Sequence, residues 1–375
     1  MLFRSGLLYA GTETGLFVSF NDGKKWEPFQ LNLPTMPITD LMIHQNDLIA
    51  STSGRSFWIL DDIAAIQNFD ANKKDLEIFK PKDTYLFFGG SSRNPLVGHN
   101  PQQGVALDYF VPEKADSVEL TLEVMEGNKV IRTYSSKADK NAKSWTGGPP
   151  KNPLLPAKKG YNRFTWDFKR QAIPGIEGVF VLGNQSGTSV APGTYTFKLT
   201  LDGKSSTTNV TVMPNPNIES TPAEYREQQA VLAQIVDAVT DIHVSVKSMR
   251  SAKSQLENHI QLLATNEDAT ELIAKAESLI ERITIWEENL IQPKQKTFQD
   301  VINFHNQLNA HFIHLKGYVD SADPKVTKGA KERLNDLLAD WKIYENERDA
   351  IINSEMSAFN AMYKQMNIPA IIMDK

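Results

Sequence analysis

Hydrophobic and polar residues divide the chain into three zones. In the first, up to about residue 69, short apolar or alternating runs are separated by Gly, Asn and Asp, which is typical of strands joined by tight turns. Gln45-Asn46-Asp47 predicts one such turn, because Asn and Asp tolerate a left-handed backbone. The runs predict strands at 7–10, 16–20, 41–44, 48–51 and 57–60.

The second zone, from about residue 85 to 213, alternates apolar and other residues. This period of two predicts half-buried antiparallel strands and therefore a β-sandwich. Glu126-Gly127-Asn128 and Asp202-Gly203 predict hairpin turns. Residues 135–159 are polar and rich in proline, so we expect a long surface loop there. The alternating positions are Val105, Leu107, Tyr109, Val111, Val118, Leu120, Leu122, Val124, Phe164, Trp166, Phe168, Tyr195, Phe197, Leu199 and Leu201.

The third zone begins at Thr221 and is predicted to be helical. Thr221-Pro222-Ala223-Glu224 combines a capping box with proline at the first helical position. Apolar residues then recur at spacings of three and four in four runs, with Pro293 and Pro324 lying between runs. The runs cover 232–263, 272–290, 298–319 and 334–362.

The run lengths predict how these helices pack. The first and fourth helices would be about 40 residues, or about 60 Å, and the middle two about 26. Short connections favour antiparallel neighbours. We therefore expect an antiparallel helical bundle or coiled-coil stalk, with a two-helix coiled coil near the β zones that thickens to four helices at its tip.

Composition narrows the class of protein. A chain of 375 residues with 41% hydrophobic and 23% charged residues predicts two to three soluble domains. The net charge of −5 is spread along the chain, which argues against nucleic acid as a partner. No stretch is apolar enough to span a membrane, and there is no cysteine to form a disulfide or ligate a metal. The first residues do not form a signal peptide, and we expect the chain to be truncated there.

The segment 19–26, S-F-N-D-G-K-K-W, resembles the Asp-box, although Asn21 and Lys25 depart from the usual Asp and Thr. Ser19 opens the box, Asn21 would cap the turn, Gly23 would take a positive φ, and Trp26 would pack under the hairpin. Turn chemistry explains each residue, so we favour a structural role over a functional one.

Further motifs extend the resemblance. G-L-L-Y-A-G-T-E-T-G at 6–15 and G-R-S-F-W-I-L-D-D at 54–62 resemble the closing blades of bacterial sortilin-like, BNR-repeat β-propellers, often labelled glycosyl hydrolases. Ser53 stands where that family usually has His. Asn100-Pro101, Gly104, G-Y-N-R-F-T-W-D at 160–167 and A-P-G-T-Y at 191–195 resemble the Ig-like domain, similar to that of hook-capping proteins, that follows such propellers.

This resemblance implies a multidomain β plus α protein. Its parts would be incomplete propeller blades at 1–69, a connector at 70–103, an Ig-like β-sandwich at 104–214, a helical stalk or bundle at 221–366 and a tail at 367–375. It also implies further N-terminal blades that this chain lacks, and an extracytoplasmic location: periplasmic, cell-surface or secreted.

The sequence predicts no complete active site. Glycosidic hydrolysis needs two carboxyl groups about 5–10 Å apart. In the first zone the candidates are Glu13, Asp40, Asp61 and Asp62, and for the Asp61-Asp62 pair we favour a solvated strand end over a catalytic role. Only Arg4 and Arg55 are available there to hold a substrate carboxylate, which argues against a sialidase.

No cofactor or metal site is predicted. His305 falls on the third helical seam, and His311 and His314 lie one turn apart without an HExxH pattern. No glycine-rich phosphate loop or nucleophile elbow is present.

Three hypotheses for function follow. The first is a non-catalytic region that closes the propeller, acts as a spacer, and binds a protein partner or self-associates through the stalk. The alternative is part of a BNR-repeat glycoside hydrolase whose catalytic residues lie mostly on the absent blades, with a glycan as ligand. The third, a sortilin-like peptide receptor, rests on fold analogy alone.

Overall fold

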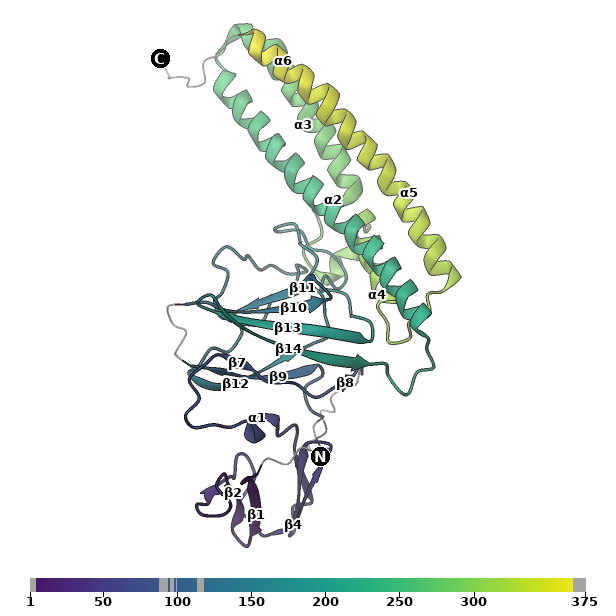
Figure 1. The fold of residues 1–375 in the computed structure, drawn as a ribbon. Coiled ribbons are helices and arrows are strands. Elements are labelled where there is room, and N and C mark those ends of the chain that lie inside the picture. Colours follow the sequence, from purple (N-terminus) through teal and green to yellow (C-terminus); the bar gives the residue numbers. More distant parts are fainter. Residues whose placement is uncertain (1–4, 88–93, 95–97, 99, 113–117, 367–375) are drawn as a thin grey trace. The chain divides into compact units, whose positions relative to one another are not determined.

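The computed structural model describes residues 5–87, 94, 98, 100–112 and 118–366. Over these residues the chain combines several small antiparallel sheets with a helical C-terminal part (Figure 1). It forms two compact units. The first comprises described residues of Met1–Ala138, Pro153–Phe168 and Pro192–Asn215, and the second Asp139–Asn152, Lys169–Ala191 and described residues of Pro216–Lys375. The predicted tail at 367–375, residues 1–4 and much of 88–99 lie outside the described residues.

The first unit begins with two three-stranded antiparallel sheets. One has the order β1 (Leu8–Thr12), β2 (Gly15–Ser19), β3 (Glu27–Pro28), and the other β4 (Ile38–His44), β5 (Asp47–Thr52), β6 (Phe57–Leu60). The five strands predicted in this zone are confirmed. Within the described residues these sheets do not close into a ring.

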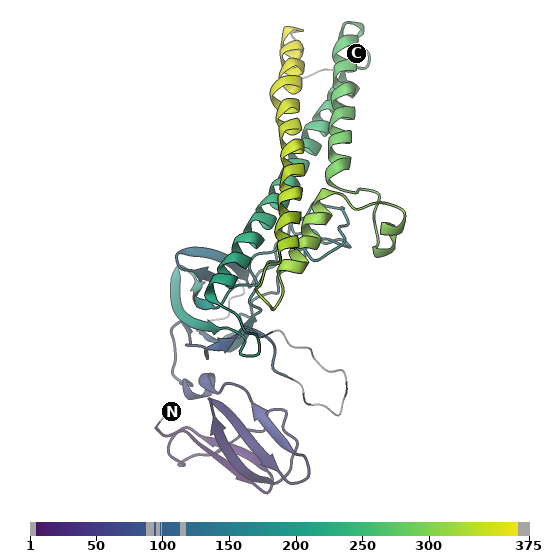
Figure 2. The same cartoon turned by 90° about the vertical axis from the view of Figure 1, so that its right-hand side faces the viewer.

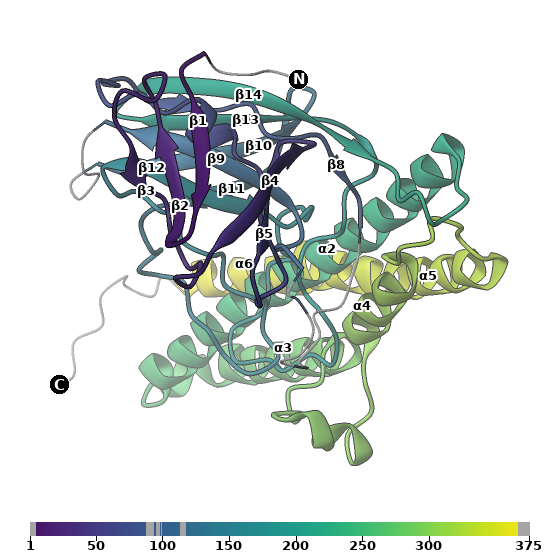
Figure 3. The same cartoon turned by 90° about the horizontal axis from the view of Figure 1, so that it is seen from below.

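The two small sheets meet where β1 lies beside β4 (Figure 3). Gly11 allows this close approach, because a Cβ there would lie 2.6 Å from a methyl carbon of Ile38. Apolar side chains fill the space between the sheets. The buried set is Leu16, Leu33, Met36, Ile38, Leu48, Ala50 and Ile63. A single turn of helix, α1 (Ala64–Gln67), follows β6.

Two further sheets complete the first unit. The larger has the order β11 (Lys129–Ser135), β10 (Leu120–Glu126), β13 (Gly193–Leu201), β14 (Lys204–Met213), β8 (Thr84–Tyr85), with β8 parallel to β14. The smaller has the order β12 (Gly160–Trp166), β9 (Val105–Val111), β7 (Glu77–Ile78). The predicted hairpin turns are confirmed: 127–128 joins β10 to β11, and Asp202 and Gly203, both with positive φ, join β13 to β14.

Aromatic side chains fill the space between these two sheets. Trp166 on β12 is fully buried, and its ring lies 5.2 Å from the ring of Tyr195 and 5.5 Å from that of Phe197, both on β13. Tyr134 on β11 meets Phe164 on β12 at 4.6 Å. The alternating positions therefore point into a shared core, as the period of two predicted.

The second unit is built on helices. They are α2 (Pro222–Leu263), α3 (Thr270–Leu290), α4 (Leu308–Val319), α5 (Lys328–Ala350) and α6 (Ser357–Gln365), the last two joined by a π-helical turn, Ile351–Met356. Short 3₁₀ segments, η1 (Glu267–Ala269) and η2 (Phe298–Ile302), precede α3 and α4. The capping box predicted at Thr221 is present and begins α2.

Contacts between helices give their directions. Glu227 on α2 pairs with Lys331 on α5, and Ser245 accepts a hydrogen bond from Arg348 at 2.8 Å. The partners are 104 and 103 positions apart, so α2 and α5 run parallel. Helices α3 and α4 run antiparallel to α2 and α5, as Figure 2 also shows.

The predicted helix arrangement was therefore wrong. The two long helical segments, α2 and α5 with α6, run parallel to each other. In the second unit α3 and α4 run in the opposite direction, and α3 packs along one half of α2 and α4 along the other. The third run is not one helix over 298–319, because only Leu308–Val319 is α-helical. Residues 291–307 form an inserted loop, and α4 resumes the direction of α3 after it.

Two loop segments pack with the helices in the second unit. One is 139–152, and the other is 169–191, here called the strap. Ile173, Ile176, Val179 and Val181 of the strap are buried in the same apolar core as the helices. Segment 139–152 joins it through Trp145, whose Nε1 donates to a strap carbonyl at 2.8 Å. Part of the predicted surface loop is thus tied to the helical core.

Candidate functional site

The aspartates that follow β6 line an open cleft in the first unit. Its volume is about 570 Å³, which lies within the range typical of small-molecule sites. The turn between β4 and β5 forms one side, and the segment around β8 forms another. Lining residues include Gln45, Asp47, Asp61, Asp62, Lys82, Asp83, Tyr85 and Gln102.

Asp62 is used to hold the backbone of the cleft. It is 8% exposed and has a positive φ of 50°. Its Oδ1 accepts a hydrogen bond from Asn46 Nδ2 at 2.5 Å and one from the backbone N–H of Ala64 at 3.1 Å. A carboxylate with two such donors fixes the β4–β5 turn and the backbone that leads into α1. Asp62 is therefore a structural residue of the cleft wall.

Asp47 is also engaged. Its Oδ1 accepts the backbone N–H of Asp62 at 2.9 Å, and its Oδ2 lies 3.1 Å from the ammonium of Lys82. The ion pair and the backbone bond fix the β4–β5 turn against the end of β6. Asp83 accepts the backbone N–H of Thr211 at 2.9 Å, so three of the four carboxylates that line the cleft hold the protein's own groups.

Asp61 is the carboxylate left for chemistry. It is exposed, and among the described residues no other residue forms a hydrogen bond or ion pair with its side chain. Partial burial, and then the negative charge of Asp47, raise its pKa above the usual aspartate range, while Lys82 and Arg163 act in the opposite direction. A carboxyl group of raised pKa can donate a proton or a hydrogen bond at higher pH than an ordinary aspartate.

Arg163 on β12 joins this wall to the neighbouring sheet. Its Nε and Nη2 each donate to the carboxylate of Asp108 on β9 at 2.7 Å. Nη2 also donates to the carbonyl of Asp62 at 3.0 Å, and Nη1 to that of Asp61 at 3.4 Å. This two-pronged ion pair with a nearly buried aspartate positions the main chain on which Asp61 stands.

Glu13 is not part of the cleft. It lies in the turn between β1 and β2 and is exposed, away from the residues that line the cleft. Arg55 and Asp40 are likewise exposed and do not line it. The structure therefore brings Asp61 and Asp62 together and leaves Glu13 apart.

The Asp-box forms the tight turn after β2. Ser19 Oγ accepts the backbone N–H of Gly23 at 2.9 Å, and Asn21 Oδ1 accepts that of Lys25 at 2.8 Å. Gly23 has a φ of 80°, and Asp22 before it also has a positive φ. Trp26 lies beside Gly23 but is 41% exposed. The side chains of Ser19 and Asn21 thus hold the turn itself, and the backbone N–H of Asp22 ties it to Gly6 O at 3.0 Å.

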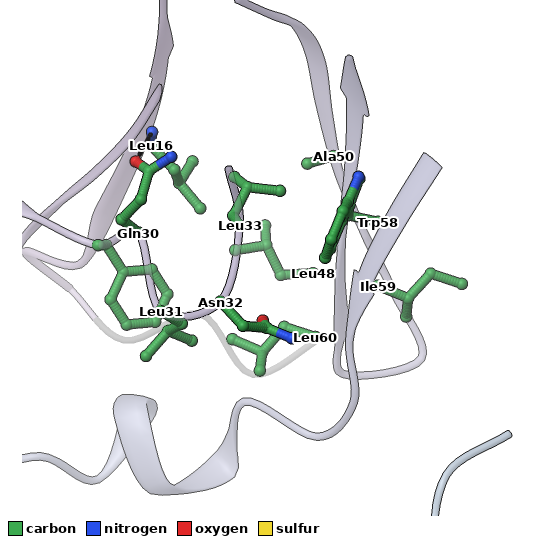
Figure 4. A pocket seen from close by; sticks show the side chains of 11 residues that line it. Leu16, Gln30, Leu31, Asn32, Leu33, Leu48, Ala50, Trp58, Ile59 and Leu60 are labelled. Carbon is green, nitrogen blue, oxygen red and sulfur yellow. Dashed lines mark hydrogen bonds between the residues drawn. The ribbon is translucent and has the colours of Figure 1, made fainter. Parts of the chain in front are cut away.

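A second, smaller pocket lies between the two opening sheets (Figure 4). Its volume of about 50 Å³ is far below that of a typical ligand site. Leucine side chains and Trp58 surround it, and Gln30 spans its edge, accepting from Leu16 N at 3.3 Å and donating to Pro34 O at 2.9 Å. The pocket is a packing gap in the apolar core.

No cluster of His, Asp or Glu in the described ranges could hold a metal ion. His305 is exposed in the loop before α4, so its predicted place on a helical seam was wrong. His311 and His314 are exposed on α4, and His314 lies against Tyr318. Within the same described residues, no helix is long and apolar enough to cross a membrane.

Sequence reasoning missed Asn46, Lys82, Asp108 and Arg163. The available signals were Arg163 and Asp108, each a charged residue within a strand of large apolar side chains. The partners of Arg163 lie 55 and about 100 positions away, so no local pattern could name them. No model of a protein family, no curated protein and no solved structure matches this chain.

Proposed function

We propose that this chain is the non-catalytic C-terminal region of an extracytoplasmic β-propeller protein of the sortilin-like, BNR-repeat type. In this proposal the two opening sheets are incomplete blades that contribute to propeller closure, the paired larger sheets are an Ig-like spacer, and the helices bind a protein partner or self-associate. The Asp-box turn, the apolar core shared by the opening sheets and the motif order in the sequence support the assignment.

One observation carries the non-catalytic part of the proposal. Hydrolysis of a glycosidic bond needs two carboxyl groups that are available to substrate. In the cleft, Asp62 is bonded to Asn46 and Ala64, and Asp47 is paired with Lys82. Asp83, which also lines the cleft, accepts the backbone N–H of Thr211 at 2.9 Å. Of the four carboxylates that line the cleft, Asp61 alone has no bond to another residue among those described, so the cleft offers one free carboxyl group where the reaction needs two.

The test is an assay of the full chain for release of reducing ends from a panel of polysaccharides. We expect no release above that of the heat-inactivated chain. The informative variant is Asp61→Asn, which keeps the side-chain shape and removes the titrating group. Release by the unaltered chain that disappears in Asp61→Asn would overturn the proposal.

A specific observation favours the alternative, in which this chain forms one wall of a glycoside hydrolase cleft. The raised pKa of Asp61 is the property of a general acid, and the cleft has room for a sugar ring. The second carboxyl group would then come from a blade outside this chain. In the longer protein, Asp61→Asn would lower kcat by at least about 100-fold under this alternative and leave it unchanged under the first proposal.

A further inference from the structure

The loop between α3 and α4, residues 291–307, exposes two large apolar side chains. Phe298 is 70% exposed and Ile302 is 82% exposed, the highest value among the large apolar residues described. They occupy the two ends of η2, about 8 Å apart at the 3₁₀ rise of about 2 Å per residue. Figure 2 shows this segment standing out to the side of the helices. We call residues 294–302 the tip.

The tip is well ordered by its own hydrogen bonds. The Asp300 carboxylate accepts the backbone N–H of Lys296 at 2.7 Å and that of Thr297 at 2.8 Å. Gln295 is 1% exposed, and its Nε2 donates to Phe304 O at 2.7 Å and to Asn306 Oδ1 at 3.1 Å. These hydrogen bonds fix the backbone of the tip, and the exposed side chains of Phe298 and Ile302 form none of them.

The tip carries two positive charges and one negative charge, from Lys294, Lys296 and Asp300, and so a net charge of +1. Lys294 and Lys296 are exposed and form no ion pair within the described residues. Asp300 is the only acid between 291 and 307, and its carboxylate is turned onto the two backbone N–H groups. The remaining exposed neighbours are Thr297, Gln299 and Asn303, which are small or uncharged. A surface that met this tip would encounter apolar groups bordered by two ammonium groups and one carboxylate, with a net positive charge.

We propose that the tip docks on an anionic lipid surface, with Phe298 and Ile302 inserted among the acyl chains and Lys294 and Lys296 at the phosphate level. Apolar insertion and attraction of lysines to acidic headgroups are the two forces that hold peripheral proteins on membranes, and here one short loop presents both. The ordered backbone lowers the entropic cost of insertion. This docking is independent of the propeller assignment.

The test uses flotation of the full chain with vesicles of phosphatidylglycerol and, in parallel, of phosphatidylcholine. We expect binding to the first and little to the second. Phe298→Ser with Ile302→Ser should reduce partitioning at least about 10-fold, the loss expected from two large apolar groups. Lys294→Gln with Lys296→Gln should reduce it about 10-fold and remove most of its salt dependence.

The matched control is Val244→Ser with Ile343→Ser, which removes two apolar side chains that are 54% and 57% exposed on α2 and α5. Its partitioning should stay within about twofold of the unaltered chain, because these residues lie outside the tip. The proposal fails if the unaltered chain does not float with phosphatidylglycerol vesicles, or if the tip variant floats equally well. It also fails if sedimentation shows a dimer that only the tip variant loses, since a second copy would then be the occupant.

Discussion

Lowering the pH should destabilise the helical unit through one buried histidine. His243 on α2 is fully buried between the strap and α4. Its Nδ1 donates to Pro174 O at 2.7 Å, and its Nε2 accepts from Asn309 Nδ2 at 3.1 Å. The bond to Asn309 requires the neutral ring, because a protonated Nε2 would face the amide donor, whereas Nδ1 donates to Pro174 O in both protonation states. Burial lowers the pKa of His243 to about 4, with Lys247 one turn away acting in the same direction.

The size of the effect follows from proton linkage. In the unfolded chain a histidine has a pKa of about 6.5, so between pH 6.5 and 4 the unfolded state binds more protons than the folded state. The stabilisation is therefore complete above about pH 6.5 and is lost as the pH falls towards 4. At about 1.4 kcal/mol for each tenfold change in proton affinity, the full loss is about 3 kcal/mol, of which about 2 kcal/mol is lost by pH 5.

Urea unfolding followed by circular dichroism at 222 nm, at pH 7 and pH 5, measures this loss. His243→Gln retains a donor and an acceptor but does not titrate, so its stability should fall by about 2 kcal/mol less than that of the unaltered chain. His314→Gln, an exposed histidine on α4, is the control and should behave as the unaltered chain does. The reasoning is refuted if His243→Gln shows the same drop between the two pH values.

Three further predictions concern single residues. Arg163→Met leaves the carboxylate of Asp108, which is 6% exposed, without its ion-pair partner, so the free energy of unfolding should fall by about 2–3 kcal/mol in urea melts. Gly187→Ala would place a Cβ 1.8 Å from the carbonyl oxygen of Arg170, and the same melts should show a loss of more than about 3 kcal/mol. Gly317→Ala, whose Cβ meets open space in α4, should instead stabilise by about 0.5–1 kcal/mol, and a loss there would contradict this account.

Features that depend on neighbouring residues, such as helix starts and strand positions, could be predicted from the sequence. The capping box at Thr221 placed the start of α2, and the alternation of large apolar residues placed β9, β10, β12 and β13. Strand β11 and strand β14 were missed as separate strands, because their exposed Lys, Ser and Thr residues break the apolar period. Very short strands such as β3 and β7 had no period to detect.

The prediction of one helix over residues 298–319 was wrong for a physical reason. Phe298, Val301 and His305 have helical spacing, but Pro293 interrupts the chain before them, and Asn303 and Asn306 follow η2. Asn side chains compete with helical hydrogen bonds by bonding to nearby groups. Here Gln295 Nε2 donates one hydrogen bond to Asn306 Oδ1 and another to the carbonyl oxygen of Phe304. The apolar spacing therefore belongs to an exposed tip instead of a packed seam.

The candidate site could be predicted only in part, because backbone geometry and distant contacts give its aspartates different roles. Asp61 and Asp62 are adjacent, and no pattern along the chain distinguishes them. What separates them is the positive φ of Asp62, which turns its carboxylate inward to Asn46 and leaves that of Asp61 facing the cleft. Because Arg163 holds the carbonyls of both residues, the orientation of Asp61 depends on a strand about 100 positions further along. A role for Asp61 in any reaction or binding event would thus be sensitive to Arg163, although Arg163 itself need not touch a ligand.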